Sequence, residues 1–246
     1  MSWRSFDPIS AARDVTEAAR GAAGDRLVSA TLYGSAAMGT FHLDRSDLNV
    51  AFVFATLDAS LLTALGSARR VWSKRRLVRP LLLTREILET SRDTFPLEYT
   101  LIAAHHAALH GPDPFAALVI ERPALRLQVE RTLRTQSLAL AWSYLDANQS
   151  PSGARQWATR AGTAIAASAS GLLHLAGEAI PAARHELAVK TSARFGVPVE
   201  ALHQILLPPG ERPPIESSAL FAVASDVVHR LLEAAEHLDA TPERKS

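Results

Sequence analysis

The stretch from Tyr33 to Phe54 constrains the fold more than any other part of this chain. It reads as the end of an apolar strand, a tight Gly34-Ser35 turn, a polar loop, and a second strand beginning at Asp47. Successive side chains of a strand point to opposite faces, so Asp47 and Asn49 are expected on one face and the apolar residues beside them in the core. Polar groups at this spacing cost stability unless they meet a ligand or water. The pattern therefore predicts a polar site where the two strands meet.

The same residues carry a resemblance to a known family. Gly34-Ser35, followed eleven residues later by Ser46-Asp47-Leu48-Asn49-Val50, resembles the signature of the DNA polymerase β-like nucleotidyltransferase superfamily. That signature is Gly-Ser, a spacer, and then Asp-x-Asp on the next strand. The kanamycin-type and small bacterial nucleotidyltransferases are the nearest comparison. The resemblance implies that the Gly-Ser turn, with Ser46, binds the phosphates of a nucleoside triphosphate and that the two positions of the acidic pair hold Mg²⁺.

The chain departs from the signature at the second acidic position. Asn49 stands where the second Asp is expected, and Met38 stands where a basic residue often follows the Ser. An amide still offers one carbonyl oxygen but lacks the charge that Mg²⁺ prefers in its ligands. Asp47 and Asn49 are therefore predicted as metal ligands and catalytic residues of a degenerate site, with Asp47 bridging the ions.

A third acid is expected on a following strand. The segment Leu77–Leu83, which we predict to be a strand, offers none, and Arg79 even reverses the sign. Glu98, in the strand-like segment 95–104, is the only candidate for the third catalytic acid.

Each of these features has a plainer interpretation. Gly34-Ser35 could be a strand-to-helix turn that only requires a small residue, Asp47 could cap a neighbouring element, and Asn49 could bond the adjacent loop. A basic cluster could bind triphosphate or nucleic acid, or it could be the solvated end of a helix. Its members are Arg69, Arg70, Lys74, Arg75, Arg76 and Arg79.

The chain is predicted to be an α+β protein of two domains. Residues 1–114 read as a nucleotidyltransferase-type domain with a mixed sheet, ending in the Gly-Pro-Asp-Pro turn at 111–114, which is strong punctuation. Residues 115–246 read as an all-α bundle, because apolar residues recur there at helical spacing.

Composition narrows the class of protein. The formal net charge of +1 gives no general attraction to nucleic acid or to an acidic membrane surface. The chain has no cysteine, the N-terminus lacks an apolar signal core, and the longest uncharged run is too short to span a bilayer. We expect a cytoplasmic protein with no membrane partner.

Three functions remain open. The resemblance implies Mg²⁺-dependent transfer of a nucleoside monophosphate from a triphosphate to an unknown acceptor, weak or lost because acids are missing. The alternative is a non-catalytic relative that binds a nucleotide, a partner protein, or itself as a homodimer. The third is a helical ribonuclease of the HEPN type, because Arg230 and His237 share the spacing of its catalytic pair. Whether the chain is an enzyme is left undecided by the sequence.

Overall fold

The chain forms two compact units. The computed structural model describes residues 6–43, 46–147, 151–208, 210–211 and 215–238. One unit comprises residues 1–94 and 98–120, and the other comprises residues 95–97 and 121–246. The predicted domain boundary after Pro114 stays a prediction, while the contacts of this structure divide after Ile120.

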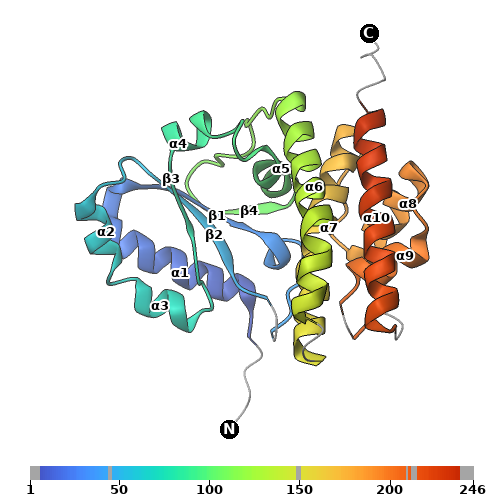
Figure 1. Ribbon diagram of the computed structural model, residues 1–246. Coiled ribbons are helices and arrows are strands. Elements are labelled where there is room, and N and C mark those ends of the chain that lie inside the picture. Colours follow the sequence, from blue (N-terminus) through green and yellow to red (C-terminus); the bar gives the residue numbers. More distant parts are fainter. Residues whose placement is uncertain (1–5, 44–45, 148–150, 209, 212–214, 239–246) are drawn as a thin grey trace. The chain divides into compact units, whose positions relative to one another are not determined.

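The first unit is a mixed sheet with helices on both faces, and the predicted α+β class is confirmed (Figure 1). Its elements are α1 (Pro8–Ala23), the 3-10 turn η1 (Gly24–Arg26), β1 (Leu27–Tyr33), the 3-10 turn η2 (Gly34–Ala36), β2 (Asn49–Phe54), α2 (Ala59–Leu65), α3 (Arg69–Lys74), β3 (Leu81–Thr84), α4 (Arg85–Thr90), α5 (Pro96–Ala104) and β4 (His106–His110). The strand order is β3-β2-β1-β4. Strand β1 runs antiparallel to β2 and β4, whereas β3 runs parallel to β2.

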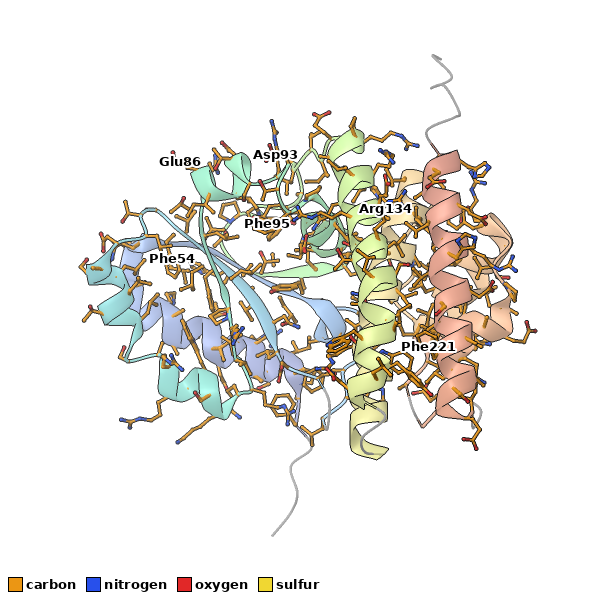
Figure 2. The ribbon with its side chains drawn as sticks, in the orientation of Figure 1. Phe54, Glu86, Asp93, Phe95, Arg134 and Phe221 are labelled. Carbon is orange, nitrogen blue, oxygen red and sulfur yellow. The ribbon has the colours of Figure 1, made fainter. Side chains whose placement is uncertain are left out.

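Strand β2 separates two hydrophobic layers. Phe52 and Phe54, the latter labelled in Figure 2, enter the layer shared with α1, α2 and α3. There the Trp72 ring stacks on Phe52 at 5.5 Å between centroids. Ala51 and Val53 enter the opposite layer, which is shared with α4 and α5. A strand covered on both faces is apolar at successive positions, as β2 is. The sheet edge that carries the polar motif is thereby held by packing on both sides.

Segment 95–104 is a helix, so the predicted strand there is wrong. The helix α5 begins at Pro96, and proline is favoured in the first turn of a helix because its missing N–H has no partner there. Tyr99 and Ile102, three residues apart, are both buried against the sheet. A short apolar run does not distinguish a strand from a buried helix by its period alone, which explains the error.

The second unit is helical, as predicted for the C-terminal half. Its helices over the described residues are α6 (Arg122–Ala147), α7 (Pro151–Leu175), α8 (Arg184–Phe195), α9 (Val199–Leu206) and α10 (Ser217–His237). Figure 2 labels Arg134 on α6 and Phe221 on α10. Arg134 bonds Glu236 across these helices at 3.0 Å, and the Phe221 ring lies 4.9 Å from that of Tyr144. No helix in the described ranges is long and apolar enough to cross a membrane.

Small residues let the helices of this unit approach closely. Ala161, Ala169 and Ser168 on α7 are buried. A Cβ built on Gly162 would lie 2.3 Å from the carbonyl oxygen of Ile205 on α9, which is far inside contact distance. Only glycine therefore fits at this crossing of α7 and α9.

We expect Gly162→Ala to lower the free energy of unfolding by about 2 kcal/mol, because the added methyl group must push two backbones apart. Gly21→Ala is the matched control: Gly21 lies in α1 with nothing within 4 Å of its Cβ position. It should be neutral or stabilise by about 0.5–1 kcal/mol, since alanine is the better helix former. Urea unfolding of both variants checks this, and equal effects would contradict the close approach.

A His–Asp pair ties the end of the sheet to α5. His106 Nε2 lies 2.6 Å from Asp113 Oδ2, and His106 Nδ1 lies 3.0 Å from the carbonyl oxygen of Ile102. Asp113 also accepts a hydrogen bond from the Phe115 N–H at 2.9 Å. Partial burial raises the pKa of Asp113, but the bonds from His106 and Phe115 together outweigh it, so this pKa lies below its usual range. The pair therefore stabilises the fold while Asp113 is ionised.

The stability that Asp113 contributes depends on pH. A carboxyl whose pKa is lower in the folded state stabilises the protein above its unfolded pKa of about 4, and this stability is lost as the pH falls through the folded value. We expect Asp113→Asn to cost about 1 kcal/mol at pH 7 and less at pH 3. Urea unfolding at both pH values measures this, with the exposed Asp93→Asn as control. A cost independent of pH would show that the ionised pair is not the cause.

Candidate functional site

The Gly34-Ser35 turn follows β1 directly, at the edge of the sheet where β2 begins. Gly34 has a φ of 73°, in the left-handed region that favours glycine. Backbone bonds close the turn: the Met38 N–H donates to the Gly34 carbonyl at 3.0 Å, and the Thr40 N–H donates to the Ser35 carbonyl at 2.9 Å. The helical conformation here is limited to the three-residue turn η2. A phosphate bound here would meet a closed turn and not the N-terminus of a long helix.

Asn49 lies against this turn. In the ladder of β1 and β2 it is the partner of Tyr33. A Cβ built on Gly34 would lie 2.8 Å from Asn49 Nδ2, so any side chain at Gly34 would displace the amide. The same amide donates a long hydrogen bond to the Asp47 carbonyl, at 3.4 Å. Asn49 therefore lies beside the turn, and the binding roles expected for the turn and the polar pair stay predictions.

Burial alternates along the start of β2. Leu48 and Val50 are 1% and 0% exposed, whereas Asp47 is exposed and Asn49 is half-buried. The predicted alternation is confirmed, although the strand begins at Asn49 and Asp47 lies just before it. Within the described residues, the Asp47 carboxylate makes no hydrogen bond or ion pair, so it can meet a ligand.

Arg76 fastens the loop that precedes β2. Its Nε donates to the Ser46 carbonyl at 3.2 Å, and its own carbonyl accepts the Leu48 N–H at 3.1 Å. The Ser46 hydroxyl accepts a bond from the His42 N–H at 3.0 Å, which closes the loop from the other side. Arg76 has a φ of 64°, a conformation that costs a non-glycine residue about 1–3 kcal/mol. Sequence analysis identified Arg76 only as a member of the basic cluster, because a positive φ at a non-glycine residue has no sequence signature.

The segment before β3 brings a second arginine to this edge. Strand β3 runs parallel to β2 from Leu81 onward, and Leu77 forms a bridge with Leu48. Arg79 lies between these two points, so its backbone runs beside the start of β2 at Asn49. Where a third acid is expected on a following strand, the chain presents a cation.

Tyr33 occupies the middle of the same edge. It is the partner of Asn49 on one side and of His106 on the other, so the three side chains project from one face of the sheet. Burial raises the pKa of Tyr33 to about 12. Its hydroxyl therefore stays protonated at neutral pH and can donate a hydrogen bond but cannot act as a base.

The residues at this edge do not fit a pair of Mg²⁺ ions. Glu98, the predicted third acid, lies exposed in the first turn of the helix α5 and does not belong to the sheet. Within the part of the chain that the structure describes, no three His, Asp or Glu side chains gather to hold a metal ion. Asp47 and Asn49 offer one carboxylate and one amide, whereas Mg²⁺ prefers charged oxygen ligands in octahedral geometry. The metal roles of Asp47 and Asn49 and the catalytic role of Glu98 stay predictions.

The pair predicted for a ribonuclease lies in the helical unit. Arg230 and His237 line a cavity of about 360 Å³ together with Arg194 and Glu233. Arg230 Nε donates to Asp226 at 2.8 Å, and His237 Nδ1 lies 2.6 Å from the Glu233 carbonyl oxygen. Both side chains are thus engaged within α10, and the ribonuclease hypothesis stays a prediction that no contact favours.

Comparison with known proteins bears on the fold. No protein-family model and no curated protein sequence matches the chain. Among solved structures it is similar to the spectinomycin adenyltransferase AAD(9) from Enterococcus faecialis, whose crystal structure contains ATP and spectinomycin. The TM-score is 0.54 at 13% sequence identity, and the alignment covers 93% of this chain and 99% of that chain. At this identity the likeness shows the fold alone, and the chain has a nucleotidyltransferase-type fold.

Proposed function

We propose that this chain binds a nucleoside triphosphate at the Gly34-Ser35 turn and that its transfer of a nucleoside monophosphate to an acceptor is weak or lost. The observation that carries the proposal is the contact between the turn and the polar start of β2, where the Asn49 amide fills the space beside Gly34. Asp47 lies next to it, exposed and with no partner for its carboxylate among the described residues. A backbone turn and hydrogen-bonding side chains at one sheet edge suit a phosphate chain.

The fold supports a nucleotide as the ligand. The spectinomycin adenyltransferase of similar fold was crystallised with ATP, and its alignment extends over nearly all of both chains. The identity of the acceptor is open.

The missing acid argues against efficient transfer. Two Mg²⁺ ions can activate an attacking oxygen and neutralise a leaving one, but they need more than one carboxylate to hold them. Asp47 is the only acid of the expected three that lies at this edge. A non-catalytic role in which the chain binds a nucleotide, a partner protein or a second copy of itself is therefore the alternative to transferase activity.

The nucleotide site can be tested through Gly34. We expect Gly34→Ala to weaken the binding of ATP or GTP by about tenfold or more, because the methyl group displaces the Asn49 amide. Gly24→Ala is the control: it puts alanine at a φ of 58° at the other end of β1, with nothing within 4 Å. Calorimetric titration measures both, and equal binding by Gly34→Ala and Gly24→Ala would move the nucleotide away from this turn.

The effect of the missing charge can be tested by restoring it. We expect Asn49→Asp to raise the affinity for ATP in the presence of Mg²⁺ by about tenfold, since a second carboxylate helps to hold the ion. The gain should vanish in Asn49→Asp combined with Asp47→Ala. Pyrophosphate release should be slow or absent in the wild type and faster in Asn49→Asp. If the wild type binds triphosphate tightly only with Mg²⁺ and loses it in Asp47→Ala, the site is an active one and the weak-or-lost proposal is wrong.

A further inference from the structure

The segment from α3 to β3 concentrates positive charge beside the candidate site. One of its cations is paired: Arg75 bonds Asp14 on α1 at 2.6 Å. The others make no ion pair with any residue that the structure describes. These unpaired cations are Arg69, Arg70, Lys74, Arg76 and Arg79.

Arg76 is the cation most firmly positioned. Its Nε and its carbonyl bond the two residues that flank Asp47, namely Ser46 and Leu48. Its two Nη groups make no hydrogen bond within the described chain. The side chain is half-buried, and a charge removed from water acts more strongly on a neighbour. The Arg76 guanidinium is thus fixed against the loop that precedes β2, and its two Nη groups can donate to a ligand.

Arg79 adds a second charge at the same edge. It is exposed, and it lies between the bridge at Leu77 and the start of β3, next to the start of β2. Asp47 is the only acid in the motif that these arginines flank. The edge therefore carries a positive charge in place of the negative charge that a metal site needs.

We infer that Arg76 and Arg79 bind the phosphates of the nucleotide directly, in place of Mg²⁺. The inference rests on the proposed nucleotide binding at the Gly34-Ser35 turn and specifies how the triphosphate is held. A guanidinium presents a planar set of N–H donors that matches phosphate oxygens, and such charge-assisted bonds are among the strong ones in proteins.

The neutral side chain at Asn49 fits this arrangement. A carboxylate at this position, two residues from Asp47, would repel a triphosphate unless a cation lay between them. With an amide here, the triphosphate meets one carboxylate fewer, and the two arginines add positive charge beside it. The amide at Asn49 and the two arginines would then act together, with the arginines in the place of Mg²⁺.

The test compares ATP affinity in EDTA and in Mg²⁺ by calorimetric titration of the full chain. We expect the wild-type Kd in EDTA to lie within about threefold of the Kd in Mg²⁺. Asn49→Asp should bind ATP more weakly than the wild type in EDTA, and Mg²⁺ should restore its binding.

Variants assign the effect to residues. Arg79→Gln, which removes no contact within the described chain, should weaken ATP binding in EDTA by about tenfold or more. Arg76→Gln should do the same, and its thermal unfolding is measured to show that the loop remains folded. Arg85→Gln is the control, because Arg85 is exposed and unpaired at the far end of β3, and it should leave the Kd unchanged.

The outcomes separate this inference from the proposed function. ATP binding that requires Mg²⁺, or that survives Arg79→Gln undiminished, overturns the inference and leaves nucleotide binding in place. A wild type that binds neither ATP nor GTP under either condition overturns the proposed function itself. Metal-independent binding that Arg79→Gln weakens and Arg85→Gln does not supports both.

Discussion

The absence of a side chain at Gly34 is the constraint on which the candidate site depends. The chain leaves β1 there in a left-handed conformation, and the missing Cβ leaves room for the Asn49 amide from the paired strand. That contact places the turn directly beside the start of β2. It also sets where Asp47 emerges, because Leu48 beside it is buried and cannot shift without opening the core. A single backbone position thus links strand pairing, core packing and the polar edge.

Local rules in the sequence account for much of this. The alternation of Asp47 and Asn49 with buried residues follows from the period of a strand, and the structure confirms it. Two helix starts follow an equally local rule, since Asp7 and Asp58 accept backbone bonds at the N-termini of α1 and α2. The need for glycine at position 34 was expected only in general terms, because the sequence does not reveal which side chain will lie against it.

Structural features that depend on tertiary contacts could not be predicted from the sequence. Segment 95–104 is rich in aromatic and aliphatic residues, which suit a strand as well as a buried helix, so Glu98 was expected on the wrong kind of element. The strained φ of Arg76 accompanies two tertiary contacts. Its side-chain Nε donates to the Ser46 carbonyl, thirty residues away, and its backbone carbonyl accepts the Leu48 N–H. Local propensity contains no information on such contacts, and a run of arginines reads equally well as a solvated helix end.

Arginine side chains in the place of Mg²⁺ would change the chemistry that is open to a bound nucleotide. A guanidinium neutralises phosphate charge, but it has no acceptor for a proton and does not lose its own at physiological pH. It can hold a triphosphate without activating the hydroxyl group of an acceptor. Tyr33, whose pKa burial raises to about 12, is equally unable to take a proton at neutral pH. Of the described side chains at Ser35, Asp47 and Asn49, only the Asp47 carboxylate could then accept one, and it would have to do so without an ion to align the attacking oxygen. If the proposed nucleotide binds as inferred, an edge built in this way would favour its retention over its turnover.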